Sequence, residues 1–443
     1  MEDRQYFDTD RLIPTYFRQA LPVVFNMAIT LIYNLADTWF IARTNDAMLV
    51  AGVSLCAPLF MVLMAVGNIF GQGGSSLIAR MLGRGDRDSV GRVSAFCFYA
   101  AIFCGVAAAI PLVGFRRPIL ALLGANAETA AHAEAYFTVL AVAAPAEILT
   151  FIHSNLLRSE GLSTESVIGS VSGSLLNIVL DPILISALGW GARGAAIATA
   201  LGYILTDVIY LFVVRKKSAC LSMDIRSAHV DKEERRQIIT IGTAAAITNI
   251  ASAVCQVFMN KFLLPYGNDR IAALGIVTRI TMITQLVLVG FSFGGVPLFG
   301  FLYGAKAHEK LNRLLKFCTL FLCGLALTIS LITFLLAAPM MRVFIDNAAI
   351  VSEGARMLRW QISGMVFCAV VLLFTCMFQG TGRSVQALVM SLSRQGLLFL
   401  AVFGAATTIA GYNGFLAAQP LSDLLSAALA LAMYARLRRS PAH

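Results

Sequence analysis

The chain has 443 residues, is 58% hydrophobic and only 13% charged, and has a mean hydropathy of +0.78. A water-soluble domain carries roughly 25% charged residues, so this composition excludes an ordinary soluble protein and indicates one that crosses a membrane repeatedly. The net charge of +10 does not indicate a nucleic-acid partner, because the basic residues cluster in loops between apolar stretches.

Apolar stretches long enough to cross a bilayer, which takes roughly 20 residues, recur along the whole chain. The longest polar connection, Arg215 to Arg236, lies near the middle. We therefore predict an all-α polytopic membrane protein with two six-helix lobes around a central cleft: an N-terminal lobe at about 1–217, a cytoplasmic connection at 218–235 and a C-terminal lobe at 236–443. The twelve predicted spans are at about 16–41, 49–72, 90–114, 133–157, 166–187, 193–214, 237–264, 271–300, 314–338, 357–379, 386–409 and 413–435.

An even number of spans places both termini on one side of the membrane. Most of the 34 Lys and Arg residues fall in the termini and in the loops of that side, to which we assign Arg158. Because basic loops remain in the cytoplasm, we expect both termini to be cytoplasmic, in a bacterial-type inner membrane. The nine cysteines lie mostly within apolar segments without metal-ligand spacing, which is typical of free thiols that pack as small apolar groups.

The two halves repeat. A shift of 221 residues aligns Gly74 with Gly295, Gly83 with Gly304 and Gly161 with Gly382. Six spans against six keep the same orientation, so the repeat is parallel, about an axis along the membrane normal. Two such lobes with a cavity between them are typical of a transporter.

Polar residues at membrane depth concentrate in the first half. Asn177 and Asp181 lie one helical turn apart in an otherwise apolar segment, and therefore share a face of the helix. Other predicted spans of this half also carry polar faces, with these main residues: Asn26, Thr30, Asn34 and Asp37 in the first, Glu147, Thr150, Ser154 and Asn155 in the fourth, and Thr199, Tyr203, Thr206 and Tyr210 in the sixth. Helices with polar faces in a membrane turn them toward one another.

The second half lacks the corresponding groups. The shift of 221 residues aligns Asp37 with Phe258, Asn155 with Cys376, Asn177 with Leu398 and Asp181 with Val402. The N-terminal lobe is therefore expected to hold a site that the C-terminal lobe does not. Two carboxylates with amide and hydroxyl oxygens suit a hard cation, or a proton shared between the acids. The alternative is that these groups only hydrogen-bond helix to helix.

Four further charges in the spans have two interpretations. Asp207 and Asp423 occupy similar places in the sixth and twelfth spans and could only anchor the interface. Arg279 and Arg394 could pair with an acid across the cleft, or be neutralised locally. The sequence does not decide between these roles.

Four stretches together resemble the multidrug and toxic compound extrusion (MATE) family. They are Ala36 to Thr38, Gly74 to Asp86, Asn177 to Pro182 and Gly191 to Thr199. The resemblance extends over the whole chain and is strongest to the DinF-like branch, and to its MepA-type members in particular. The seventh and tenth spans lack the acidic residues associated with the NorM-like branch.

The resemblance implies which residues bind the coupling cation. It assigns this role to Asp37, Asn177, Asp181 and Thr199, which would also be the metal ligands if the ion is Na⁺, with Asn155 nearby. It also assigns to Pro22 the role of bending the first helix. We add Asn34, Glu147 and Tyr203 as candidate substrate contacts.

We therefore expect a secondary antiporter rather than an enzyme. It would export an organic compound, expected to be cationic and amphipathic, in exchange for Na⁺ or H⁺, without a further cofactor. Its expected partners are the small-molecule substrate and membrane lipid, not nucleic acid, and the two-lobe plan suits a monomer. The alternative is a flippase for a lipid-linked oligosaccharide or a related lipid, which would need a basic central cavity.

Overall fold

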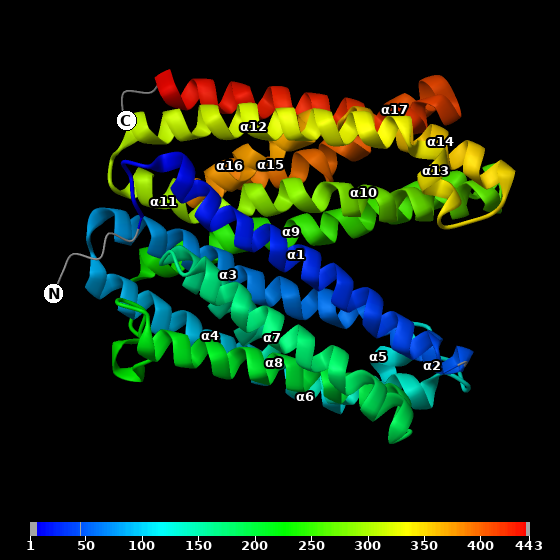
Figure 1. The fold of residues 1–443 in the computed structure, drawn as a ribbon, viewed down its shortest axis with the longest axis horizontal. Helices are drawn as coiled ribbons and strands as arrows, with labels where there is room; N and C mark the ends of the chain where they lie inside the picture. The colour runs from blue at the N-terminus through cyan, green and yellow to red at the C-terminus, as the bar shows by residue number, and fades with distance from the viewer. Residues whose placement is uncertain (1–6, 45, 440–443) are drawn as a thin grey trace.

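The computed structural model describes residues 7–44 and 46–439, and over these residues it is almost entirely helical, without strands. The helices form two bundles that lie side by side, with α1 crossing between them (Figure 1). The start of α1 and the end of α17 lie at the same end of the molecule (Figure 1). The predicted fold class, an all-helical membrane protein of two lobes, is confirmed.

The N-terminal lobe consists of long helices joined by short loops. Its elements are α1 (Leu12–Ala42), α2 (Ala47–Ser54), α3 (Ala57–Arg84), α4 (Arg87–Gly114), α5 (Arg116–Leu122), α6 (Ala130–Ser159), α7 (Ser163–Asp181), a π-helical segment (Pro182–Ala187) and α8 (Gly191–Lys216). Residues 217–231 then connect the lobes and include one 3₁₀ turn, Ile225–Ser227.

The C-terminal lobe has more broken helices. Its elements are α9 (Lys232–Leu263), a 3₁₀ turn (Leu264–Tyr266), α10 (Asn268–Gly294), α11 (Val296–Gly304), α12 (His308–Leu335), α13 (Ala337–Arg342), α14 (Ala348–Ser363), α15 (Met365–Gly380), α16 (Ser384–Arg394) and α17 (Leu397–Arg439). The pair α14 and α15 bends by 46° at Gly364, and α17 is kinked at Gly411, whose φ of 53° lies in the left-handed region that favours glycine.

These helices accommodate the predicted spans. Nine described helical stretches are long and apolar enough to cross a membrane, and the bent pair α14–α15 makes ten. One of the nine, Ser384–Arg438, contains both the eleventh and the twelfth predicted spans, on either side of Gly411. The seventh predicted span lies in α9, which is more polar than the other long helices.

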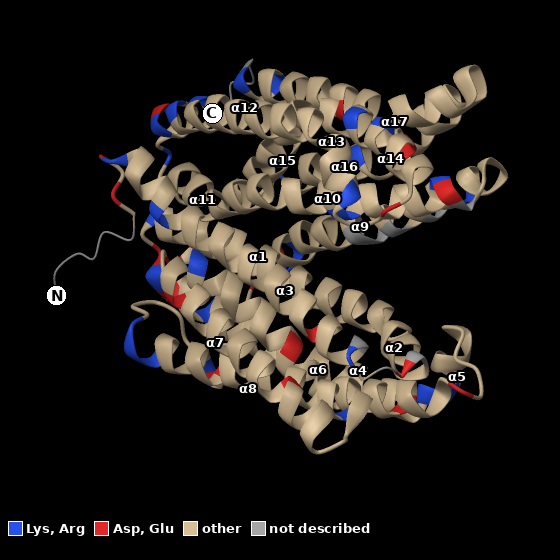
Figure 2. Ribbon diagram, turned by 45° about the vertical axis from the view of Figure 1, so that its right-hand side comes forward, with Lys and Arg blue, Asp and Glu red and all other residues tan. Residues whose placement is uncertain are grey.

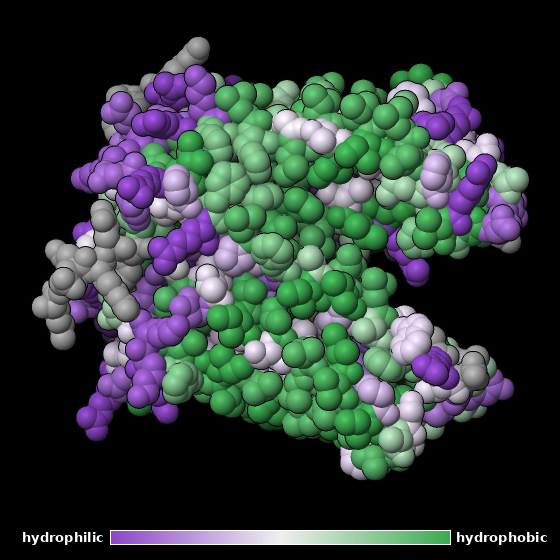
Figure 3. Space-filling model, viewed as in Figure 1, coloured by the Kyte–Doolittle hydropathy of each residue, from purple (hydrophilic) through white to green (hydrophobic). Residues whose placement is uncertain are grey.

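The surface has the polarity expected of a protein within a bilayer. On the face shown in Figure 3, hydrophobic residues cover the middle of the molecule, and hydrophilic residues gather at the two ends. The Lys, Arg, Asp and Glu residues are found mainly toward the helix ends (Figure 2). Large apolar side chains such as Phe103 and Ile110 are 74% and 70% exposed, as expected of a helix that faces lipid.

Helix α1 packs against both lobes. Its first half contributes Tyr16 and Ala20 to the hydrophobic core of the C-terminal lobe, and the Tyr16 hydroxyl donates to the Phe291 carbonyl at 3.0 Å. Its last turns contribute Ile41 to the core of the N-terminal lobe. Pro22 lies between these two parts. Because proline removes a backbone hydrogen bond inside a helix, α1 is weakened where it passes from one lobe to the other.

The lobes meet closely at the end where α1 begins. A Cβ added at Gly83 of α3 would overlap the Phe301 carbonyl oxygen of α11, and one added at Gly304 would overlap the Arg80 carbonyl oxygen of α3. Gly83 and Gly304 are partners in the repeat, so this crossing is nearly symmetric. At the opposite end the surface is hollowed between the lobes (Figure 3). The structure is therefore closed at the end of the termini and open at the other.

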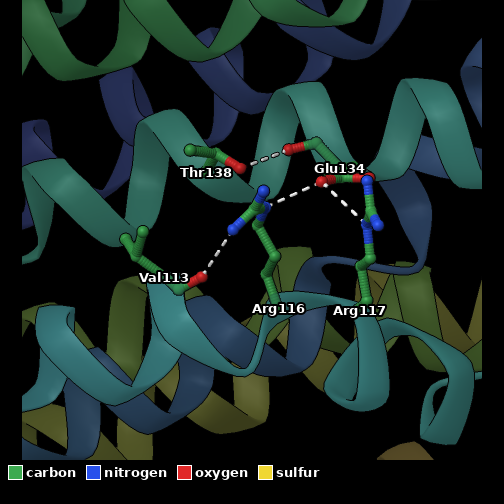
Figure 4. A network of polar contacts seen from close by, with 5 residues as sticks. All are labelled: Val113, Arg116, Arg117, Glu134 and Thr138. Carbon is green, nitrogen blue, oxygen red and sulfur yellow. Dashed lines mark hydrogen bonds and ion pairs between the residues drawn. The ribbon is translucent and has the colours of Figure 1, made fainter.

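An ion-pair network anchors the open end of the N-terminal lobe (Figure 4). Arg116 Nε donates to Glu134 Oε1 at 2.7 Å, and Arg117 Nε lies 3.4 Å from both Glu134 oxygens. Arg116 also donates to the Val113 carbonyl at 3.0 Å, and the Thr138 hydroxyl donates to the Glu134 carbonyl at 2.7 Å. The network joins the end of α4 and the start of α5 to α6.

Candidate ion site and central cavity

The Asn177–Asp181 turn lies in the last part of α7, with side chains that are 1% and 0% exposed. Neither Asp181 oxygen, nor Asn177 Oδ1, has a hydrogen-bond partner among the described residues. Asp181 is followed by Pro182 and the π-helical segment, and such interruptions occur frequently at functional sites. A fully buried carboxylate without a donor is costly, and both Asp181 oxygens are open to a ligand.

The second acid of the site comes from α1. Asp37 Oδ1 is buried and also lacks a partner among the described residues, and Asp37 lies close enough to Asp181 for the two negative charges to repel each other. Tyr33, one turn before Asp37 on α1, lies within electrostatic range of both carboxylates. The acids of α1 and α7 thus belong to one electrostatic site.

Helix α8 supplies the hydroxyl of the site. Asn177 Nδ2 donates to Thr199 Oγ1 at 3.2 Å, and Thr199 Oγ1 donates to the Ala195 carbonyl at 3.1 Å. The amide nitrogen of Asn177 is therefore held by Thr199, which leaves Oδ1 free to bind a cation. The structure brings Asn177 and Thr199 into direct contact, with Asp181 one turn further along α7.

The chemistry of these donors fits a hard monovalent cation. Carboxylate, amide and hydroxyl oxygens are the ligands that such ions prefer. The described residues contain no group of three or more His, Cys, Asp or Glu that could hold a metal ion, so a site with the donors of a structural or catalytic transition metal is not found there. The four buried oxygens of Asp37, Asn177 and Asp181 without partners are instead suited to Na⁺, and the carboxylates also to a proton.

A cavity of about 540 Å³ lies between the lobes, next to this site. Its wall combines apolar and aromatic side chains with amides and hydroxyls from helices of both lobes. The lining residues that the later argument uses are Tyr33 (α1), Phe151 and Arg158 (α6), Asn177 (α7), Thr199 and Tyr203 (α8), Phe293 (α10), Leu372 (α15) and Arg394 (α16). Asn177 and Thr199 therefore belong to both the ion site and the cavity.

The remaining candidates occupy different places. Asn155 lines the cavity, but its Oδ1 accepts from Arg158 at 2.9 Å and its Nδ2 donates to the Phe151 carbonyl at 2.7 Å, so its amide is already bound. Tyr203 lines the cavity. Glu147 is only 2% exposed and interacts with Tyr203 from behind the cavity wall. Asn34 is exposed on α1 and is not among the lining residues.

The structure also shows the surroundings of the four charged residues whose roles the sequence left open, Asp207, Arg279, Arg394 and Asp423. Asp207 accepts from the Thr150 hydroxyl at 2.8 Å. Arg394 Nε donates to Asp423 Oδ1 at 3.1 Å, a pair within the C-terminal lobe rather than across the cleft. Arg279 is exposed. Local neutralisation is thus the role that the structure supports for Arg394 and Asp423.

Two cavity residues were missed by the sequence analysis. Tyr33 lies beside Asn34 in the sequence. Both residues are three or four positions from Thr30 and from Asp37, so helical spacing alone does not tell which of the two shares their face. Arg158, which we placed in a loop, lies in the last turn of α6 and lines the cavity. The predicted fourth span ended at residue 157, one residue before Arg158, whereas α6 continues to Ser159.

Comparisons with known proteins agree with this architecture. A profile of the MatE family matches residues 22–183 and 244–404, which is more than half of the chain. The multidrug export protein MepA of Staphylococcus aureus is 29% identical over 440 residues, covering 99% of this chain and 97% of that protein.

Two solved structures share the fold. A MATE in the bent conformation superposes with a TM-score of 0.90 at 24% identity, covering 98% of this chain and 96% of the other. An outward-facing multidrug resistance MATE family transporter of the MOP superfamily superposes with a TM-score of 0.88 at 24% identity, covering 96% and 95%. The profile match over both halves, together with these relatives, confirms the resemblance inferred from the motifs: the chain belongs to the MATE family.

Proposed function

We propose that this protein is a secondary transporter that exports amphipathic organic compounds in exchange for Na⁺ or H⁺. The observation that carries the proposal is the buried set of carboxylate and amide oxygens of Asp37, Asn177 and Asp181, without partners among the described residues, beside a cavity between two lobes. The multidrug export role named for the MepA relative supports the same function.

Residues shared by the ion site and the cavity suggest how the two are coupled. Asn177 and Thr199 line the cavity, as does Tyr33, which lies one turn before Asp37 on α1. A bound cation would neutralise the repulsion between Asp37 and Asp181 and draw α1 toward α7. Because α1 is packed against both lobes and is weakened at Pro22, this movement would reshape the cavity and release the compound.

The driving force is sufficient for export. One elementary charge that crosses 100 mV supplies about 2.3 kcal/mol, which sustains a gradient of several tens-fold in a coupled compound. The same oxygens suit Na⁺, as ligands, and H⁺, shared between the carboxylates. Either ion could therefore drive export.

The cavity volume favours a small molecule. Pockets for drug-sized ligands measure roughly 300–1,000 Å³, and the cavity of about 540 Å³ lies in this range. A flippase of lipid-linked oligosaccharides would have to accommodate a pyrophosphate and a large sugar headgroup. We therefore place the exported-compound function first. We further propose a bacterial-type inner-membrane location, cytoplasmic termini and action as a monomer.

Reconstitution in liposomes tests this function. Vesicles loaded with an amphipathic fluorescent dye would be given an imposed Na⁺ or pH gradient, with the parent, Asp37→Asn, Asp181→Asn and the exposed-acid control Asp88→Asn. We expect gradient-dependent dye movement by the parent and the control, and its loss in both site variants. Equal movement by correctly inserted site variants and parent would contradict the proposal.

A further inference from the structure

The charge of the cavity wall is opposite to the charge expected for a cation-binding pocket. Among the described residues that line it, the charged side chains are Arg158 and Arg394, and no Asp, Glu or Lys is present. The acids of the N-terminal lobe, Asp37, Asp181 and Glu147, lie outside this lining. A compound in the cavity therefore meets guanidinium groups first and carboxylates only behind the wall.

The two arginines differ in how their charge is compensated. Arg394 is paired with the buried Asp423 at 3.1 Å. Arg158 donates through Nη2 to the neutral Asn155 amide at 2.9 Å and through Nε to the Ser154 carbonyl at 3.0 Å. No ion pair joins Arg158 to an acid within the described part of the chain, in contrast to Arg116, which binds Glu134 (Figure 4).

The free side of the Arg158 guanidinium suits a carboxylate. Of its five N–H groups, two are engaged by Asn155 and Ser154, and three remain. The edge formed by Nη1 and Nη2 can donate two parallel hydrogen bonds, which is the geometry of a bidentate arginine–carboxylate pair. An arginine that lines a cavity without an acidic partner among the described residues can give this edge to a ligand.

The position of Arg158 leaves room for the rest of such a ligand. Arg158 lines both the main cavity and a small extension of about 20 Å³ beside Gln72 and Gln379, at the end of α6 near the termini. Above it the main cavity offers apolar and aromatic walls, among them Phe151, Phe293 and Leu372. The cavity thus offers a cationic group at its base and apolar and aromatic surfaces, among amides and hydroxyls, along its sides.

We propose that Arg158 forms an anion subsite at the base of the cavity, and that the exported compounds include amphipathic molecules that carry a carboxylate. This inference rests on the proposed export function and specifies its substrate class, which the sequence led us to expect as cationic. The carboxylate binds the Nη1–Nη2 edge of Arg158, and the apolar body packs between the lobes.

A matched pair of dyes tests the subsite. Binding of a rhodamine with a free carboxylate and of the methyl ester of the same dye would be measured by fluorescence anisotropy on the purified full-length protein, without a gradient. The variants are Arg158→Gln, Arg158→Lys and the control Arg279→Gln, which removes an exposed arginine outside the cavity lining.

We expect the parent and Arg279→Gln to prefer the acid over the ester. Arg158→Gln should weaken acid binding by about tenfold or more, the effect of losing a charge-assisted bidentate pair, and ester binding by less than about twofold. Arg158→Lys should retain part of the preference for the acid, because the ammonium group keeps the positive charge but cannot donate two parallel hydrogen bonds as the guanidinium does. Equal weakening of both dyes would assign Arg158 a purely structural role in the last turn of α6, and would overturn the subsite, as would a parent without preference for the acid.

Transport of the same dyes in liposomes separates this inference from the proposed function. An acid preference in binding that depends on Arg158, without gradient-driven movement of either dye, would support the subsite and contradict coupled export. Gradient-driven movement with an acid-to-ester ratio unchanged by Arg158→Gln would support export and overturn the subsite.

Discussion

The two lobes bury an acid at membrane depth in different ways. Asp423 in the C-terminal lobe is 2% exposed and accepts from Arg394 and from Gln419, each at 3.1 Å. Asp181 in the N-terminal lobe is 0% exposed and has no partner among the described residues. A buried charge is tolerated when it is paired. The comparison indicates that Asp423 is structural, and it supports the proposal that Asp181 binds a ligand.

The repeat shows where the lobes diverged. The shift of 221 residues that aligns Gly83 with Gly304 also places Gly173 and Gly202 opposite Arg394 and Asp423. Gly173 and Gly202 contact each other closely, and both line the cavity. The C-terminal lobe thus has an ion pair where the N-terminal lobe has two glycines. The absence of side chains at these glycines leaves space for the cavity beside the ion site.

The largest effect on export is expected when Asn177 and Asp181 are replaced by the residues at the equivalent positions of the C-terminal lobe. In Asn177→Leu/Asp181→Val, α7 has the side chains found at Leu398 and Val402, so it should remain helical and buried. Export in liposomes should fall by about 100-fold, near the upper range of coupling between sites. The conservative Val402→Ile should export as the parent does. Unimpaired export by the double variant would show that the asymmetry between the lobes has no role in coupling.

Stability should respond oppositely to removal of the two acids. Asp423→Ala leaves Arg394 buried without its partner and should cost about 3–5 kcal/mol, measured as a lowered thermal midpoint in detergent. Asp181→Asn removes an uncompensated charge and should leave the midpoint in Na⁺-free buffer unchanged or raised. If both variants were destabilised equally, Asp181 would be structural in the same sense as Asp423.

The symmetric crossing of the lobes provides a smaller test. Gly83→Ala and Gly304→Ala each place a methyl group against a backbone carbonyl of the opposing helix, at a cost of about 1–3 kcal/mol. Each should increase opening at the end of the termini by roughly tenfold, seen as faster hydrogen exchange in α3 and α11. Gly324→Ala, at an open position, is the control. If only one of the two variants increased hydrogen exchange strongly, the two sides of the crossing would not be equivalent.

The smallest effect on stability is expected at the ion pairs of Glu134, which lie outside the ion site and the crossing of the lobes. Glu134→Gln weakens the pairs with Arg116 and Arg117, whose side chains are 34% and 78% exposed. Partly exposed ion pairs contribute about 1 kcal/mol or less, so the thermal midpoint should decrease slightly and export should not change. Loss of export in this variant would mean that the open end of the N-terminal lobe takes part in transport.

Much of this fold could be predicted from the sequence, because apolar length and basic loops are strong signals in a membrane protein. The breaks at Gly364 and Gly411 could not, since glycine also occurs in unbroken parts of these helices and only tertiary packing selects the kinked ones. The clustering of Asn177, Asp181 and Asp37 was predicted from spacing and from the repeat. The faces of Tyr33 and Arg158 were not, because a residue at a helix end, or next to a polar neighbour, has two plausible orientations until the packing is known.

The central claim is that the oxygens of Asp37, Asn177 and Asp181 bind the coupling cation in the N-terminal lobe. The most direct measurement is substrate-free cation binding by the purified protein, as Na⁺ titrated by calorimetry at several pH values and as protons released or taken up. The account predicts saturable binding by the parent and by Arg394→Met/Asp423→Leu, and loss of this binding in Asp181→Asn. Equal cation binding by Asp181→Asn and the parent would contradict it.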